Sequence, residues 1–406
     1  MAQLQRFLLL LLIASLAVPF PIRYLFGQGI TATDVLFVML AAAWLVRALL
    51  GNAPRLGLAR YWPVLCYVAC ITLAAVISPN TDPIRLIMLG YLVALAILVG
   101  ESARIVSSER EPVMVWISAG MIPAIVGVVA LALFAIGFRL DFALHPFGTL
   151  QPGPYPRLQS TFVFPAMLTN YLTVCAVLLS FARHRLWLGP RTANAMLGLL
   201  FLCSLFTFTP GLGGMALAIG AWMVLGEGRS RWWLAGASAL FLCSLFAAAL
   251  TPIAHPSADW SFNLLGHDLY PSVRMLTWSD ALRHWSNHWL AGNGLSGGPV
   301  SVDYLDPSGI WHHLTDAHNI FLNTGAQTGL LGLAGLLILI FYVGTGRIKA
   351  ERGSLLQALS IAWLAAFVAE GLTGSYEDAR HLWALLGLIF AAAAQRRQAI
   401  PATADP

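Results

Sequence analysis

The sequence predicts an all-α integral membrane protein with about twelve transmembrane helices. Of its 406 residues, 58% are hydrophobic and only 10% are charged, and the mean hydropathy is +0.75. Soluble domains carry about 25% charged residues, so this composition excludes an ordinary soluble protein. Runs long enough to cross a hydrocarbon core of roughly 30 Å begin near residues 4, 30, 61, 84, 113, 162, 194, 211, 232, 319, 354 and 381.

The first apolar run, Leu8 to Phe20, follows Arg6 and has the pattern of either a signal peptide or a membrane span. The tripeptide 15–17, Ser-Leu-Ala, is a poor cleavage site, and Pro19 and Pro21 come directly after it. We therefore interpret this run as an uncleaved first span.

The apolar stretch Met196 to Leu225 is the weakest of the series. Pro210-Gly211 and Gly213-Gly214 break its pattern. Two short spans joined by a tight outer turn fit these residues better than one kinked helix.

Basic residues orient the chain, because Lys and Arg concentrate in cytoplasmic loops. With the N-terminus inside, most of the 23 basic residues fall in inner segments, and both termini are predicted to be cytoplasmic. The net charge of +5 follows from this topology, since the charges are scattered over short loops rather than gathered on one face. We therefore expect no nucleic-acid partner. The outer arginines are Arg23, Arg85, Arg139, Arg157, Arg274, Arg283 and Arg380.

The predicted organisation has three parts. Residues 1–250 hold spans 1–9, residues 251–318 form a large helical outer loop with interfacial helices, and residues 319–406 hold spans 10–12 and a short cytoplasmic tail. A second outer segment covers residues 138–160. In the large loop, the spacing of Trp278, Leu282, Trp285 and Trp289 predicts a helix over 272–290 that lies on the membrane interface or packs on the bundle.

The dipeptide His318-Asn319, which contains a titratable histidine, directly precedes a long apolar run. Except for His184, the ten histidines lie on or near the predicted outer side, so we expect any proton-transfer chemistry on that face. The unperturbed pKa of histidine, about 6.5, suits a general base. A capping or packing role is the alternative for His318, and Asn319 is interpreted as structural, holding the ring or capping the span.

The outer arginines Arg157, Arg274 and Arg283 together suggest an anion site near the bilayer, although each alone is typical of a solvated surface. The chain has a single lysine, Lys349. This preference for arginine favours planar guanidinium groups that hold phosphate through two hydrogen bonds. A lipid-linked diphosphate is the natural anion at that depth.

Three blocks between about residues 157 and 335 resemble the bacterial O-antigen ligase family and its relatives, the polymerases and O-oligosaccharyltransferases. The blocks are His318-Asn319 with Phe321-Leu322 and Gly329-Leu-Leu-Gly332, then 272–278 with 288–294, and finally Arg157 to Phe162 with Pro165 to Leu172. Family members often carry Ser-Arg-Gly where this chain has Thr207 to Gly214. The missing charge would come from Arg139, Arg157 or Arg380, or that contact is absent.

The resemblance implies a GT-C-like fold and an inverting glycosyl transfer that needs neither metal nor cofactor. The donor would be an O-antigen glycan on undecaprenyl diphosphate, and the acceptor a sugar hydroxyl of the lipid A core. The site would face the periplasm from the inner membrane of a Gram-negative bacterium. His318 would be the base, and Arg274 and Arg157 would bind the diphosphate.

Further residues complete this expectation. Arg139, Arg283 or Arg380 would supply a third positive charge. Glu370, near the outer end of a span, would pair with Arg380 or contact the acceptor. The pair Glu377-Asp378 is expected to be solvated or to pair with nearby arginines.

Other interpretations remain open. A zinc site could use His312, His313, Asp316 and His318, or His284 with His288. A transporter could also have twelve spans, but transporter sites lie midway across the membrane, whereas the ionisable residues here cluster at the outer surface. A polymerase or a protein O-oligosaccharyltransferase would share the same base and arginines.

Overall fold

The computed structural model describes residues 1–25, 28–51, 56–78, 80–106, 108–145, 157–254, 258–296, 298–305 and 311–399. The centre of the outer segment 138–160 therefore lies outside the described residues. The same holds for parts of the outer loop, at 255–257, 297 and 306–310, and for the tail beyond residue 399.

Helices make up most of the chain. They are α1 (Ala2–Ser15), α2 (Ala32–Leu49), η1 (Leu58–Tyr61), α3 (Trp62–Ile77), α4 (Pro83–Ala103), α5 (Arg110–Ala135), α6 (Pro165–His184), α7 (Pro190–Leu205), α8 (Gly211–Leu225), α9 (Trp232–Ala249), α10 (Val273–Asn287), α11 (Ile320–Lys349), α12 (Leu355–Trp363), η2 (Leu364–Ala369), η3 (Glu370–Leu372) and α13 (Arg380–Ala399).

The helices confirm a multi-pass membrane protein. Within the described residues, eight helical segments are long and apolar enough to cross a membrane: α2, α3 with η1, α4, α5, α6, α9, α11, and α12 with η2 and η3. A helix also begins close to each of the other four predicted starts, as α1, α7, α8 and α13. The break at Pro210 separates α7 from α8, as the sequence predicts. Crossing of the membrane by these four helices stays a prediction.

Short strands are the main departure from the all-α expectation. They are β1 (Pro21–Leu25), β2 (Gln28–Thr31), β3 (Leu144–His145), β4 (Arg157–Leu158), β5 (Leu250–Thr251), β6 (Phe262–Leu264), β7 (His267–Pro271), β8 (Val302–Leu305) and β9 (Trp311–Leu314). All pair antiparallel, as β1-β2, β3-β4, β5-β7-β6 and β8-β9. The outer loop contains the predicted helix as α10, but much of the rest of its described part is hairpin rather than helix.

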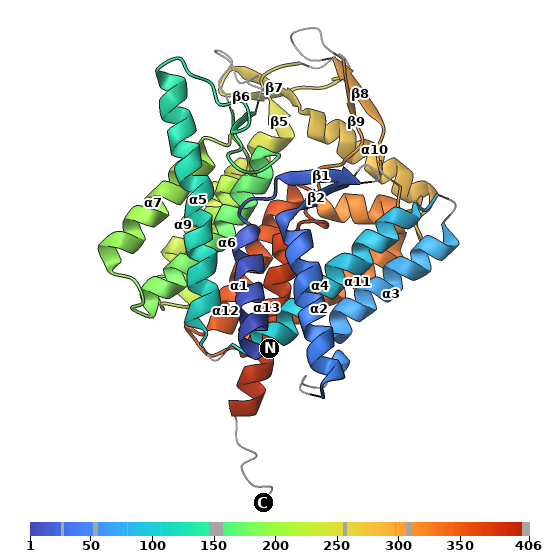
Figure 1. Cartoon of the computed structure of the whole chain (residues 1–406). Coiled ribbons are helices and arrows are strands. Elements are labelled where there is room, and N and C mark those ends of the chain that lie inside the picture. Colours follow the sequence, from blue (N-terminus) through green and yellow to red (C-terminus); the bar gives the residue numbers. More distant parts are fainter. Residues whose placement is uncertain are drawn as a thin grey trace, which may run out of the picture.

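The bundle is built around α6, which packs against α5, α7, α8 and α12 and is buried along almost its whole length (Figure 1). Small residues allow these close helix approaches, as is common in membrane bundles. A Cβ atom at Gly120 of α5, for example, would lie 2.4 Å from Cys175 Sγ of α6. The hairpins and α10 gather at one end of the bundle, and the N-terminus and the end of α13 lie at the other (Figure 1).

Helix α11 is interrupted at Gly329, whose φ of 60° and ψ of −156° are not helical. The loop after α10 fills the break, and amides of each segment donate to carbonyl groups of the other. The four pairs, amide first, are Leu330 with Trp289 (2.9 Å), Leu331 with Leu290 (3.1 Å), Asn293 with Ala326 (2.8 Å) and Gly294 with Gln327 (2.9 Å). Buried backbone groups near a bilayer need such partners, because water cannot supply them.

Gly292→Ala is expected to destabilise this junction strongly. Gly292 has a φ of +67°, and an added Cβ would lie 2.3 Å from the carbonyl carbon of Gln327, which is backbone and cannot rotate away. The left-handed conformation alone costs about 1–2 kcal/mol for a non-glycine residue. Thermal unfolding of the detergent-purified protein should show a lower Tm.

The matched control is Gly236→Ala in α9, where an added Cβ meets nothing within 4 Å and φ is not positive. Alanine is favoured over glycine in a helix interior by roughly 0.5–1 kcal/mol, so this variant should melt at or slightly above the wild-type temperature. Equal Tm values for the two variants would contradict the role given to Gly292.

Candidate functional site

His318 lies in the loop that leads into α11, with an unusual backbone conformation. Its φ is 49°, a region that few non-glycine residues adopt. Asp316 supports this geometry, because its Oδ1 accepts a hydrogen bond from the His318 amide at 2.5 Å and lies 3.6 Å from His318 Nδ1. The carboxylate two residues before His318 therefore fixes its backbone and lies close to the imidazole.

Asn319 is the N-cap of α11. Its Oδ1 accepts hydrogen bonds from the amides of Phe321 (3.0 Å) and Leu322 (3.1 Å), and its Nδ2 donates to the Leu372 carbonyl at 3.1 Å. Of the two structural roles favoured by the sequence, this is the capping role. The cap fixes the start of α11 directly after His318.

Arg274 reaches the same place from α10. Thr277 Oγ1, one turn further along, donates to the Ala317 carbonyl at 3.3 Å, so α10 packs on the residue before His318. Arg274 Nε is buried and has no hydrogen-bond partner in the part of the chain that the structure describes. Burial lowers the pKa of Arg274, and nearby Tyr376 acts in the opposite direction. A buried, unpartnered N–H is costly unless a ligand satisfies it.

Arg157, on β4, lies close enough to Arg274 and His318 to affect the pKa of His318. Its Nε donates to the Thr207 carbonyl at 3.0 Å, in the turn between α7 and α8. This turn belongs to the stretch in which the resembling family often carries an arginine. Burial, followed by the charge of Arg274, lowers the pKa of Arg157 to about 10, so the guanidinium remains protonated at neutral pH.

The two arginines also act on His318. Although 44% of its side-chain surface stays accessible, surrounding protein atoms desolvate the ring, and this is the main cause that lowers the pKa of His318. Asp316 raises it, and the charges of Arg274 and Arg157 lower it further. His318 is therefore a neutral imidazole at pH 7, the form that can accept a proton.

The other three candidate arginines are engaged elsewhere. Arg139 pairs with Asp141 at 2.9 Å on the surface, and Arg283, 70% exposed, pairs with Asp280 at 2.5 Å. Arg380 Nε donates to Asp34 at 2.8 Å, so it joins α13 to α2. The structure therefore brings Arg157 and Arg274 to His318 and leaves Arg139, Arg283 and Arg380 in ion pairs with aspartates elsewhere.

Glu370 is buried among α6, α8 and η3, and the expected pair with Arg380 is not formed, since Arg380 binds Asp34. Its carboxylate instead accepts hydrogen bonds from Asn170 Nδ2 at 3.0 Å and from Thr173 Oγ1. Gly214 makes room for this group, because a Cβ there would lie 2.3 Å from Glu370 Cγ. The contacts of Glu370 are those of a residue that joins helices.

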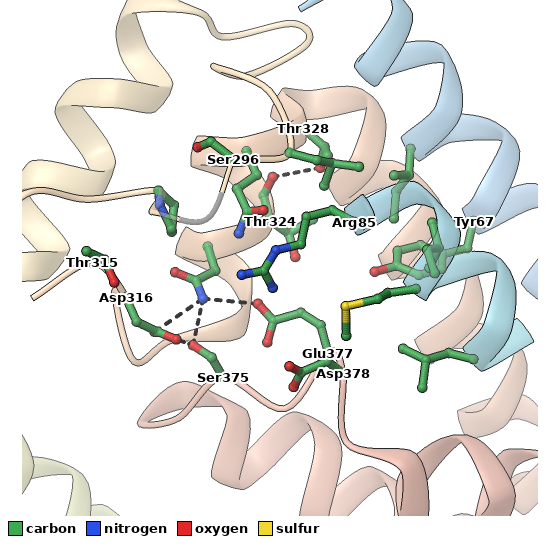
Figure 2. A pocket seen from close by; sticks show the side chains of 18 residues that line it. Tyr67, Arg85, Ser296, Thr315, Asp316, Thr324, Thr328, Ser375, Glu377 and Asp378 are labelled. Carbon is green, nitrogen blue, oxygen red and sulfur yellow. Dashed lines mark hydrogen bonds between the residues drawn. The ribbon is translucent and has the colours of Figure 1, made fainter. Parts of the chain in front are cut away.

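A network of polar side chains behind His318 is absent from the sequence prediction. Ser375 Oγ donates to Asp316 Oδ1 at 2.6 Å, and Asn323 Nδ2 lies within hydrogen-bond distance of Ser375 (2.7 Å), Glu377 (3.1 Å) and Asp316 (3.3 Å) (Figure 2). Glu377 is therefore not simply solvated or paired with an arginine. Burial, and then Asp316, raise its pKa to about 8.

Tyr376 is a second residue that the sequence prediction missed. Its side chain is 3% exposed and lies close enough to Arg274 for the two to affect each other's pKa. Burial is the largest cause that raises the pKa of Tyr376, so its phenol stays protonated. The acidic and aromatic run Ser375 to Asp378, directly before a span, is the only sequence signal that could have indicated these residues.

Three histidines of the two possible zinc sets contact other residues. His313 Nδ1 lies 2.7 Å from Asp303, His312 stacks on Tyr304 with centroids 5.1 Å apart, and His284 Nε2 lies 3.6 Å from Asp280. Among the described residues, no group of three or more His, Cys, Asp or Glu side chains could hold a metal ion.

Comparison with known proteins adds no assignment. No protein-family model and no curated protein sequence matches this chain. The candidate site is thus defined by its own geometry: a neutral histidine just before α11, beside two partly buried arginines from α10 and β4.

Proposed function

We propose that the protein is a membrane glycosyltransferase of the O-antigen ligase type. It moves a glycan from undecaprenyl diphosphate to a sugar hydroxyl of the lipid A core, at the periplasmic face of a Gram-negative inner membrane, with both termini in the cytoplasm. The observation that supports this most is the buried Nε of Arg274, which has no hydrogen-bond partner among the described residues. Arg274 lies close to His318, whose lowered pKa leaves the ring neutral at pH 7. The sequence resemblance supports the choice of donor and acceptor.

The proposed reaction is a single displacement with inversion. His318 takes the proton of the acceptor hydroxyl while that oxygen attacks the anomeric carbon of the donor sugar. The bond between this carbon and the diphosphate oxygen breaks, and the electron pair leaves with the lipid diphosphate. Arg274 and Arg157 stabilise the charge that develops there, as fixed cations do without reorganising. The proton on His318 then passes to the released diphosphate or to water.

A polymerase is the second candidate, because it would use the same base and arginines and differ only in its acceptor. Transport is less well supported, since α10, which carries Arg274, lies with hairpins β6-β7 and β8-β9 at one end of the bundle rather than midway along it (Figure 1).

Purified protein, assayed in a chelator with undecaprenyl-diphosphate glycan and rough lipopolysaccharide, tests the proposal. Product on the lipopolysaccharide supports a metal-independent ligase. Elongation of the donor without use of the acceptor would replace it with a polymerase, and no reaction with either acceptor would remove the glycosyltransferase assignment.

The pH dependence of kcat/KM provides an independent test. Because desolvation and the two arginines lower the pKa of His318, the base is unprotonated down to a lower pH than a free histidine. The acid limb of the profile should therefore bend below about 6.5, the unperturbed value. An acid limb centred above 6.5 would contradict the environment given to His318.

A further inference from the structure

A cavity separates α3 and α4 from the outer end of α11, directly behind the loop that carries His318 (Figure 2). Its volume is about 210 Å³. This is somewhat below the roughly 300–1,000 Å³ of sites for drug-sized molecules, so the cavity suits a small group rather than a long chain. The residues that line it come from five parts of the sequence, around residues 67–71, 85–92, 295–299, 315–328 and 375–378.

One side of the cavity offers hydrogen-bond donors and acceptors close together. Arg85 of α4 points into the middle of the cavity, toward Glu377 (Figure 2). Its guanidinium makes no hydrogen bond or ion pair within the described parts of the chain. Burial raises the pKa of nearby Asp378, and the charge of Arg85 acts in the opposite direction. Gln327 and Thr315, which both donate and accept, complete this side.

The mixture of groups argues against an ion as the occupant. A metal cation would face the guanidinium of Arg85, and an inorganic anion would face Asp316 and Asp378. Asn323 holds Asp316 and Glu377 through its amide, which keeps their oxygens engaged as acceptors rather than free to converge on a metal. With its pKa raised to about 8, Glu377 can also donate a hydrogen bond at neutral pH.

The lining also includes apolar side chains. They are Ile71 of α3 and Met88, Leu89 and Leu92 of α4. A ligand with hydroxyl groups on one side and C–H groups on the other fits such a site. A sugar ring has this character, and so does the junction between a sugar and a lipid.

Asp316 connects the cavity to the candidate base. Its carboxylate lines the cavity, and the same Oδ1 accepts the hydrogen bond from the His318 amide and lies 3.6 Å from Nδ1. A ring bound in the cavity therefore lies against the loop that holds His318, whereas Arg157 and Arg274 are not among the residues that line the cavity.

We infer that this cavity is a saccharide-binding subsite that holds the acceptor glycan, with Arg85 as a specificity-determining contact and Asp316 as the residue that positions the glycan relative to His318. The inference rests on the proposed transfer function, because it divides the site into a diphosphate side and an acceptor side.

Arg85→Gln tests the subsite through the split between donor and acceptor kinetics. Loss of a charged hydrogen bond should raise the KM for rough lipopolysaccharide about tenfold or more, with the donor KM and kcat within about twofold of wild type. Arg139→Gln is the matched control, because Arg139 is an outer arginine that pairs with Asp141 on the surface. An unchanged acceptor KM in Arg85→Gln would overturn the inference and leave the proposed function standing.

A binding measurement separates the two proposals. Saturation-transfer NMR of wild type and Arg85→Gln would use two probes, rough lipopolysaccharide and the free core oligosaccharide released from it. We expect both probes to bind wild type and to lose affinity in Arg85→Gln, with tighter binding of the lipid-linked form if the apolar side chains contact lipid. If Arg85→Gln loses affinity for both probes but the wild-type protein transfers no glycan, the saccharide subsite stands and the ligase function is rejected. Equal binding of both probes by the two proteins would reject the subsite.

Discussion

Glycan transfer is expected to fall by about 10²–10⁴-fold when His318 is replaced by alanine, the usual contribution of a positioned general base. A second variant, His318→Asn, separates chemistry from folding. His318 has a φ of 49°, and asparagine tolerates this conformation better than most residues, but its amide cannot accept the proton. Both variants should show the wild-type Tm and a similarly low transfer rate in the purified system.

His313→Ala is the appropriate control for this experiment. His313 is also an outer histidine beside an aspartate, but it lies on β9 and pairs with the exposed Asp303. Its removal should leave transfer within about twofold of wild type. If His318→Asn retained more than a tenth of the wild-type rate, His318 would not be the base, whatever the effect of alanine.

Arg274→Lys is expected to lower kcat by about 10²–10³-fold, the usual cost of removing one fixed donor to a developing negative charge. Lysine keeps the positive charge but loses the planar arrangement that can bind a diphosphate through two hydrogen bonds. The Nε of Arg274 is also buried and unpartnered in the described structure, so solvent does not replace the contact that this N–H would make to the diphosphate. Single-turnover kinetics with saturating donor would measure the loss.

The same helix supplies a control for Arg274→Lys. Arg283 of α10 is 70% exposed and pairs with Asp280, so Arg283→Lys should leave kcat nearly unchanged. The salt dependence of kcat provides a second test. Salt screens the charge of a surface arginine, but it screens the charge of an arginine inside the protein much less. Equal losses in the two variants would mean that the total positive charge of α10 matters, rather than the geometry at Arg274.

The sequence predicted the helices better than the site. Long apolar runs with basic inner loops locate spans because the bilayer imposes one length and one sidedness on them. The hairpins escaped prediction because strands of two to five residues, such as Leu144–His145, carry little periodic signal. Within α10, the tryptophan spacing was sufficient, and the helix begins and ends within three residues of the predicted bounds.

The arginines show why the site was predicted only in part. The partners of Arg139 and Arg283 are two and three residues away, so their local ion pairs could be inferred from the sequence. The partner of Arg380 is Asp34, on a helix at the opposite end of the chain, and no spacing predicts it. The contact between Asp316 and Ser375 joins residues 59 positions apart, so it depends on how α11 and α13 are placed.

The break in α11 has a consequence for how the protein fits its bilayer. As an unbroken rod, a 30-residue helix would extend about 45 Å, well beyond a hydrocarbon core of about 30 Å. Residues 330–349, which follow Gly329, are by themselves about as long as the hydrocarbon core is thick. The part of α11 before Gly329 begins beside His318 and is hydrogen-bonded to the loop after α10. A thicker or thinner bilayer can then change the tilt of the inner part without altering the spacing between His318 and Arg274.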